Sequence, residues 1–267
     1  MTDQRFFLQE TALLNYHAEN IQNLIAERGW NTRNEFDKIK EIYSFVKDEI
    51  KFGFNSCDKL SADRILKSGY GQCNTKTTLL MALLRAVGIP CRIHAFSVDK
   101  SLQRGILTGI AYRKAPAKLL HSWAEVYYDG KWYALEGVIL DQKYLTELQK
   151  LYSVCTGAFC GFGVSTEQLQ TPQTEWNAND TYIQHKSIEE DFGVFHSPDE
   201  MLRSHAQEVS GWKEFVYRYL IRFIMNWNVK RIRKTNGKEE KPEPKTEDES
   251  AEPQSESLSA ESRDDAI

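Results

Sequence analysis

Residues 71–92 read GQCNTKTTLLMALLRAVGIPCR, and this stretch decides the fold. From residue 74 to residue 87 it is strongly apolar with a helical pattern, and Gly88 and Pro90 end the helix. A helix this apolar is expected to be buried. Cys73 stands at its first turn, where unpaired N–H groups and the helix dipole stabilise a thiolate and can bind an oxyanion. Most cysteines are small buried side chains, so position alone leaves its role open.

A second informative stretch, residues 121–136, reads HSWAEVYYDGKWYALE. Two aromatic-rich runs flank Asp129-Gly130, a dipeptide typical of the tight turn of a β-hairpin. His121 opens the first predicted strand and Glu136 closes the second, so their side chains are expected to be neighbours across the hairpin. Such a pair would supply a general base and the carboxylate that orients it. An ordinary solvent-exposed cross-strand pair is the alternative.

Together these stretches resemble the transglutaminase-like superfamily, over about residues 35–140. The residues that carry the resemblance are Gly71-Gln72-Cys73, Leu79-Leu80, Leu84 to Arg92, His121 to Tyr127 and Gly130-Lys131-Trp132, with a lead-in at Tyr43 to Ile50 and Ser61 to Leu66. The resemblance implies an α+β fold of the papain and transglutaminase type, in a bacterial-type, single-domain form. The nucleophile helix would pack on an antiparallel sheet.

By this resemblance, Cys73 is the nucleophile and His121 is the general acid and base. The third position of the triad falls on Glu136, where the family usually has aspartate, and Asp141 is the alternative orienting carboxylate. Three further residues are expected to contact substrate or the oxyanion: Gln72, Tyr70 and Trp123.

The resemblance implies cysteine-dependent hydrolysis of an amide bond through a thioester, in a peptidase-like or glutamine deamidase-like reaction on a peptide or protein. Water is the expected acceptor because no stretch of the sequence identifies an amine site. Three alternatives stay open. They are acyl transfer to an amine, an amidase acting on small molecules or cell-wall peptides, and a catalytically idle domain that binds peptides or a partner protein.

The composition narrows the class of protein. The chain has 267 residues, 41% of them apolar, and a formal net charge of −4, which suits a folded domain and gives no reason to expect a nucleic-acid partner. The first residues lack the pattern of a signal peptide, and no apolar run is long enough to span a membrane. Five cysteines without a paired framework favour free thiols in the cytoplasm. No metal site or cofactor is expected.

We expect three segments: a catalytic domain over residues 1–205, an amphipathic helix within 206–235, and a disordered tail over 236–267. The tail contains eleven acidic and four basic residues, a net charge of −7. Apolar residues cover more than one stripe of the predicted helix at 212–233. We therefore expect this helix to dock onto the catalytic domain, and association of residues 212–234 with an anionic membrane is the less favoured alternative.

Overall fold

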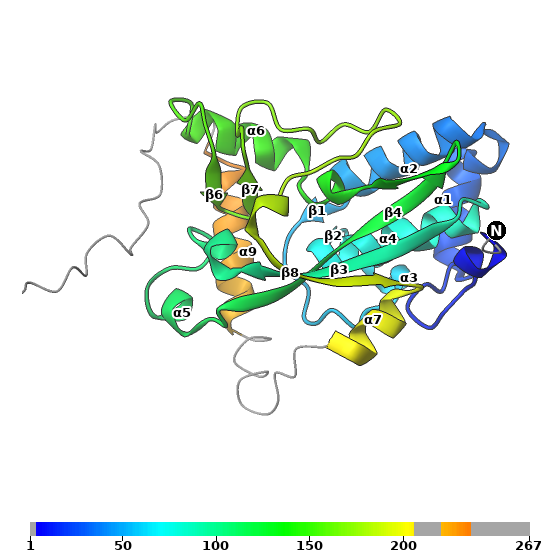
Figure 1. The fold of residues 1–267 in the computed structure, drawn as a ribbon, viewed down its shortest axis with the longest axis horizontal. Helices are drawn as coiled ribbons and strands as arrows, with labels where there is room; N and C mark the ends of the chain where they lie inside the picture. Colours follow the sequence, from blue (N-terminus) through cyan, green and yellow to red (C-terminus); the bar gives the residue numbers. More distant parts are fainter. Residues whose placement is uncertain (1–3, 206–219, 236–267) are drawn as a thin grey trace, which may run out of the picture.

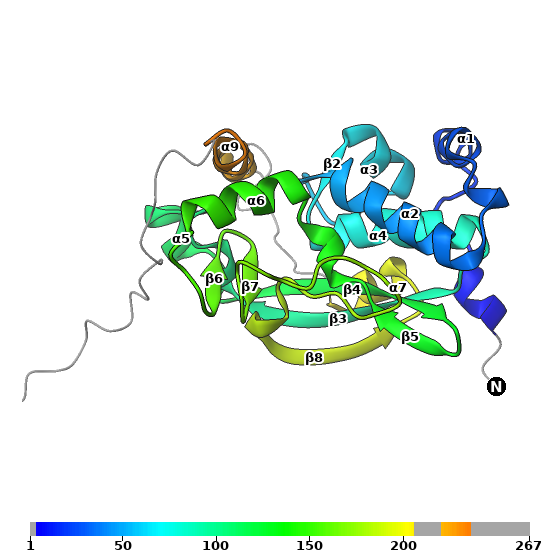
Figure 2. The same cartoon turned by 90° about the horizontal axis from the view of Figure 1, so that it is seen from above.

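The computed structural model describes residues 4–205 and 220–235. One layer is a four-stranded antiparallel sheet in the order β5-β4-β3-β8, and most helices lie on one side of it (Figures 1 and 2). The strands of this sheet are β3 (Cys91–Asp99), β4 (Lys118–Tyr128), β5 (Lys131–Ala134) and β8 (Ile188–Phe195). Two short pairs complete the strands: β1 (Lys51–Phe52) with β2 (Tyr70–Gly71), and β6 (Phe159–Gly161) with β7 (Val164–Thr166).

The α-helices are α1 (Glu19–Arg28), α2 (Glu35–Asp48), α3 (Ala62–Ser68), α4 (Cys73–Ala86), α5 (Gly109–Lys114), α6 (Gln142–Leu151), α7 (Pro198–His205) and α9 (Arg222–Ile232). No helix in the described ranges is both long and apolar enough to cross a membrane. The predicted tail, and the part of the predicted C-terminal helix before residue 220, lie outside the described residues.

Helix α4 is the centre of the core. It contacts β4 on one side and α2 and α3 on the other, and every residue from Asn74 to Arg85 is buried. Burying each leucine of this helix contributes about 1.5–3 kcal/mol to folding. Gly88 follows the helix with a φ of 83°, a left-handed conformation that suits glycine. The predicted fold class, an α+β structure with this helix packed on an antiparallel sheet, is confirmed.

The predicted hairpin is present, with a longer first strand than the sequence indicates. Asp129 and Gly130 form the turn between β4 and β5, with φ values of 47° and 78°. Glu136 was expected to close the second strand, but β5 ends at Ala134. Glu136 instead begins a 3₁₀ helix, η4 (Glu136–Ile139). This turn lets the carboxylate leave the plane of the sheet.

Three local features differ from what the sequence pattern indicates. Thr32-Arg33-Asn34-Glu35 is typical of a capping box with Thr32 as the N-cap, but the N-cap of α2 is Asn34, whose side chain accepts from Asp37 N–H at 2.9 Å, and Thr32 donates to Gly29 O. Residues 97–118 are polar and irregular in sequence, as in a long loop, but they contain α5, the end of β3 and the start of β4. Strand β8 was not foreseen because its edge position leaves most of its side chains outside the buried core.

Candidate active site

Cys73 is the first residue of α4, directly after the β1–β2 pair. The backbone N–H of Gln72 donates to Thr75 Oγ1 at 3.0 Å, which closes the first turn of the helix. A side chain on Gly71 would not fit, because an added Cβ would lie 2.7 Å from Thr75 Oγ1. The chain therefore enters the helix tightly, and Cys73 presents its thiol at the helix N-terminus, partly exposed.

Asn74 connects the start of this helix to the strand that carries the histidine. Its Nδ2 donates to Leu120 O at 3.4 Å, and its Oδ1 accepts from Ser122 Oγ at 2.8 Å. Leu120 and Ser122 are the two neighbours of His121 in β4. These two bonds place the N-terminus of α4, and with it Cys73, beside His121.

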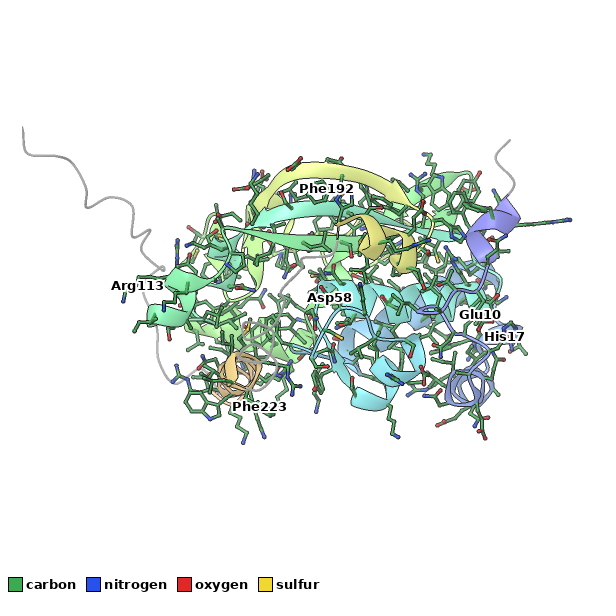
Figure 3. The ribbon with its side chains drawn as sticks, turned by 90° about the horizontal axis from the view of Figure 1, so that it is seen from below. Glu10, His17, Asp58, Arg113, Phe192 and Phe223 are labelled. Atoms are coloured by element: carbon green, nitrogen blue, oxygen red, sulfur yellow. The ribbon has the colours of Figure 1, made fainter. Side chains whose placement is uncertain are left out.

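Asp58 holds the residues on both sides of Cys73. Its two carboxylate oxygens accept from Gln72 Nε2 at 2.8 Å and from Asn74 Nδ2 at 2.9 Å. Figure 3 shows Asp58 near the middle of the molecule, between the sheet and the helices. Burial of its carboxyl raises the pKa of Asp58 above its usual value, against the two side-chain hydrogen bonds that lower it.

His121 and Glu136 form a buried pair. Nε2 of His121 lies 2.8 Å from Oε1 of Glu136, and neither side chain has any exposed surface. The other carboxylate oxygen, Oε2, accepts three backbone N–H groups, from Ile183 at 2.8 Å, Gln184 at 3.0 Å and His185 at 3.1 Å. A carboxylate with this many fixed donors is held in one orientation.

The electrostatics of this pair favour the protonated ring. Burial alone would lower the pKa of His121, but hydrogen bonding and charge from Cys73 and Glu136 outweigh it and raise that pKa to about 9. Because Nε2 faces Glu136, the second nitrogen, Nδ1, is the one that can interact with the sulfur of Cys73. Nδ1 has no well-aligned hydrogen-bond partner in the described part of the chain. Catalytic contacts of this kind often tighten only when substrate binds.

The three residues expected to contact substrate or the oxyanion lie in different surroundings. Trp123 is buried two residues along β4, with its ring centroid 5.9 Å from that of His121. The amide of Gln72 is engaged by Asp58, and its Oε1 accepts from Asn55 N–H at 2.8 Å. The hydroxyl of Tyr70 accepts from Arg222 of α9 at 3.3 Å. Trp123 therefore lines the site, while Gln72 and Tyr70 are held by neighbouring segments.

Asp141, the alternative orienting carboxylate, has other partners. Its oxygens accept from Tyr144 N–H at 3.0 Å and Phe52 N–H at 2.8 Å, and they form an ion pair with Arg233 at 2.5 Å. It therefore caps α6 and anchors the end of α9. The structure brings Cys73 and Glu136 to the same imidazole and gives Asp141 a separate structural position.

Sequence reasoning missed Asp58, Asn74 and the backbone amides of residues 183–185. Asn74 and Asp58 are polar residues close to the cysteine in sequence, which is a weak signal of a role in positioning it. The amides carry no side-chain signal, because their contribution comes from the backbone alone. In the described residues, no group of three or more histidine, cysteine or acidic side chains could hold a metal ion.

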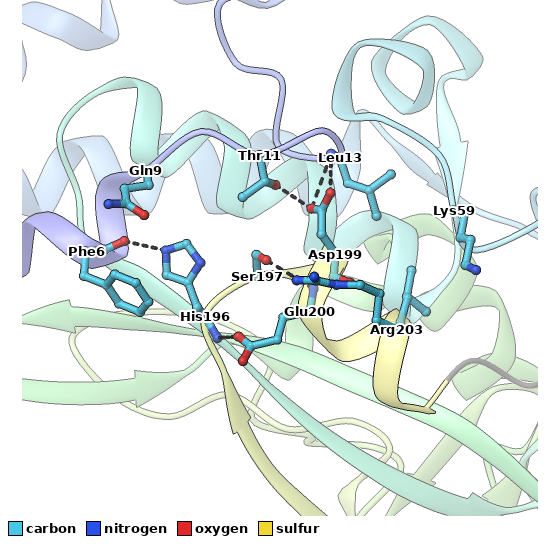
Figure 4. A pocket seen from close by; sticks show the side chains of 11 residues that line it. Phe6, Gln9, Thr11, Leu13, Lys59, His196, Ser197, Asp199, Glu200 and Arg203 are labelled. Carbon is cyan, nitrogen blue, oxygen red and sulfur yellow. Dashed lines mark hydrogen bonds between the residues drawn. The ribbon is translucent and has the colours of Figure 1, made fainter.

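A separate groove of about 750 Å³ lies between the N-terminal segment and α7 (Figure 4). Asp199 accepts from Thr11 Oγ1 at 2.5 Å and from Leu13 N–H at 3.1 Å, and His196 contacts Phe6 O at 2.5 Å. These bonds join the two segments that form the groove. None of Cys73, His121 and Glu136 lines it, so it is not part of this site.

The central part of the chain matches a known family. Residues 23–137 match the sequence profile of the transglutaminase-like superfamily. This segment belongs to that superfamily. The match includes Cys73, His121 and Glu136, and it supports cysteine-dependent chemistry in general for the transglutaminase-like core. No curated protein matches the chain.

Three solved structures are similar to this chain. A candidate cysteine protease from Cytophaga hutchinsonii is 14% identical, with a TM-score of 0.43, over 75% of this chain and 49% of that one. A candidate protease from Parabacteroides distasonis is 18% identical, with a TM-score of 0.32, over 63% and 30%. Red sea bream transglutaminase is 14% identical, with a TM-score of 0.29, over 82% and 31%. The matched region spans less than half of each of these longer proteins.

Proposed function

We propose that this chain hydrolyses an amide bond of a peptide or protein, with Cys73 as the nucleophile, His121 as general acid and base, and Glu136 as the residue that orients His121. The observation that carries the proposal is the buried imidazole. One of its nitrogens is bound to Glu136 at 2.8 Å, and Cys73 and Glu136 together raise its pKa to about 9. An imidazolium next to a thiol at a helix N-terminus favours the thiolate, which is the nucleophilic form.

In the acylation step, the Cys73 thiolate attacks the amide carbonyl carbon and a C–S bond forms. The first N–H groups of α4 have no intrahelical acceptor, so that of Cys73 is available to the developing oxyanion. The His121 imidazolium then donates its Nδ1 proton to the departing nitrogen. The C–N bond breaks, the amine or ammonia leaves, and a thioester remains on Cys73.

In the deacylation step, neutral His121 takes a proton from water as the water oxygen attacks the thioester carbonyl. The C–S bond breaks and the carboxylic acid product leaves. The sulfur departs as a thiolate next to the newly protonated imidazole, so the starting ion pair is restored. Glu136, held by three backbone N–H groups, keeps the ring in the same tautomer and orientation through both steps.

The exposure of the three groups supports a substrate that approaches from the sulfur side. Cys73 is partly exposed, whereas His121 and Glu136 are fully buried. A peptide carbonyl can therefore reach the sulfur, while bulk water does not surround the base. Water is the proposed acceptor, because no described feature near Cys73 identifies a dedicated site for an amine.

The test is a peptide library incubated with the full chain in ¹⁸O-labelled water and read by mass spectrometry, with and without a primary amine. Hydrolysis predicts products that contain one ¹⁸O atom and a rate that does not depend on the amine. Products joined to the amine, with little ¹⁸O, would instead favour acyl transfer. Cys73→Ala is expected to abolish turnover, and Cys57→Ala, at another partly exposed cysteine, is the matched control.

A catalytically idle binding domain is the competing proposal from a different functional class. It predicts that peptides bind the wild type and Cys73→Ala equally well and that neither form turns them over. Small-molecule amides and cell-wall peptides are included in the same library. Turnover of these compounds alone would instead indicate an amidase that acts on small molecules or cell-wall peptides.

A further inference from the structure

Helix α9 docks onto the domain through Met225, Val229 and Ile232, which are buried, but its other face lies in solvent. Four large apolar side chains are exposed on that face or just before the helix: Leu220 at 57%, Phe223 at 56%, Ile224 at 40% and Trp227 at 60%. Figure 3 shows Phe223 on the side of α9 that faces away from the sheet. Four exposed large apolar side chains within eight residues form a patch of the kind that marks an interaction site.

The same face is basic at its C-terminal end. Lys230, Arg231 and Lys234 are exposed, and with the four apolar residues they follow the i, i+3, i+4, i+7 spacing of one helical stripe. We call these seven residues the α9 stripe. Residues 220–235 contain five basic residues and no acidic one. The stripe therefore presents an apolar half followed by a cationic half along the helix.

The opposite face fixes the helix on the domain. Asn226 Oδ1 accepts from Phe54 N–H at 2.7 Å, and its Nδ2 donates to Phe54 O at 3.0 Å. Asn228 Nδ2 donates to Ile106 O at 2.8 Å, and Arg233 pairs with Asp141 at 2.5 Å. A helix held in this way presents the α9 stripe without needing to order itself when a partner binds, which lowers the entropic cost of binding.

Two cations of α9 already lie over its exposed rings. The guanidinium carbon of Arg222 is 4.6 Å from the centroid of the Phe223 ring, and that of Arg231 is 5.3 Å from the Trp227 ring. Aromatic and cationic side chains in this combination suit the boundary between lipid headgroups and acyl chains.

We propose that the α9 stripe binds the surface of a bilayer that contains anionic lipids. The apolar half needs an apolar environment and the basic half needs anions, and a membrane surface supplies both along the length of one helix. A nucleic acid would match the cations but leave the apolar half in water. This binding is independent of the amide chemistry proposed for Cys73, so either proposal can fail without the other.

The test is sedimentation of the full chain with phosphatidylcholine vesicles and with vesicles that also contain phosphatidylglycerol. We expect binding to the mixed vesicles only. Substituting Lys230, Arg231 and Lys234 with glutamine is expected to weaken this binding roughly 100-fold, because each cation near an anionic surface contributes a factor of roughly five. Phe223→Ser with Trp227→Ser is expected to weaken it by at least tenfold.

Two matched controls separate the stripe from general charge and hydrophobicity. Lys59, Lys67 and Lys131 are exposed elsewhere, and substituting all three with glutamine removes the same charge. Val154→Ser removes another exposed apolar side chain, 63% exposed. Both control variants are expected to bind as the wild type does.

Three results would overturn the proposal: no binding to either vesicle, equal binding to neutral and anionic vesicles, or equal losses in the stripe and control variants. A dimer in light scattering that the Phe223→Ser, Trp227→Ser variant dissociates, without vesicle binding, would assign the stripe to a second copy of the chain instead. Hydrogen exchange of residues 206–219 or 236–267 that rises in that variant, again without vesicle binding, would assign it to the chain's own segments.

Discussion

His121 Nε2 lies 2.8 Å from Glu136 Oε1, although β5 ends two residues before the glutamate. The bond forms because the chain turns into η4 directly after the strand, so the carboxylate points back toward β4. The extra methylene of glutamate, relative to the aspartate usual in the family, is accommodated by this turn. Three backbone N–H groups then hold the second carboxylate oxygen.

Glu136→Gln is expected to reduce the rate of thioester formation by roughly 10⁴-fold, as removal of the orienting charge does in a serine-histidine-aspartate triad. An amide in this place cannot both accept from Nε2–H and stabilise the imidazolium. Single-turnover kinetics measure the rate, and circular dichroism checks that the variant folds. A folded variant with the wild-type rate would remove Glu136 from the mechanism.

Cys73 is expected to react with iodoacetamide at neutral pH at least tenfold faster than Cys57. Both thiols are partly exposed, but of the two only Cys73 interacts with an imidazole whose pKa is raised. Mass spectrometry of the modified peptides gives both rates in one experiment. His121→Ala should bring the two rates together, and a difference that persists in this variant would contradict the ion pair.

The acylation rate is expected to fall as pH rises through about 9, because the pKa of His121 is raised to that value and the imidazolium is the acid of this step. The same sign applies to stability. The protonated ring contributes stability that is fully present below its ordinary pKa of 6.5, and this contribution is lost as pH rises through about 9. A pH profile of single-turnover acylation measures the alkaline limb. A rate that stays constant well above pH 9 would exclude His121 as the acid.

Asp58→Asn is expected to lower kcat roughly tenfold or more with little change in KM, because one of the two amides flanking Cys73 would then face another donor. The cost in stability is about 1–3 kcal/mol. The rate of Cys73 alkylation distinguishes the two possible roles of Asp58. A positioning role predicts that the rate changes in this variant, and a purely structural role predicts that it does not. Asp63→Asn, which loses a similar bond to Asn15, is the control and should leave alkylation unchanged. Unchanged kcat and alkylation in a folded Asp58→Asn protein would contradict the positioning role.

Asp141→Asn is expected to destabilise the fold by about 3 kcal/mol and to leave Cys73 alkylation unchanged. Burial alone would raise the pKa of Asp141, but the bonds and charge of Arg233 lower it, so its contribution to stability is lost as pH falls through the acidic range. Chemical denaturation measures the loss. If the folded variant instead lost Cys73 reactivity, Asp141 rather than Glu136 would be the orienting residue.

The elements with a strong local pattern were predictable. The apolar run of α4, the glycine and proline that end it, and the Asp129-Gly130 turn are signals that a few neighbouring residues produce by themselves. Strand β8, the end of β3 and the start of β4 were not predictable in the same way. They form through pairing with distant strands, and their own sequence does not alternate clearly between apolar and polar residues.

The sequence by itself determined which side chains carry the proposed chemistry, because a cysteine at a helix start and a histidine in a tight hairpin are local features. Only the tertiary structure decided which carboxylate reaches the histidine, since Glu136 and Asp141 are five residues apart and only packing turns one inward and gives the other to Arg233. It also decided which face of α9 stays in water. Periodicity shows that a helix has apolar residues, but contacts with the rest of the fold select the ones that are buried.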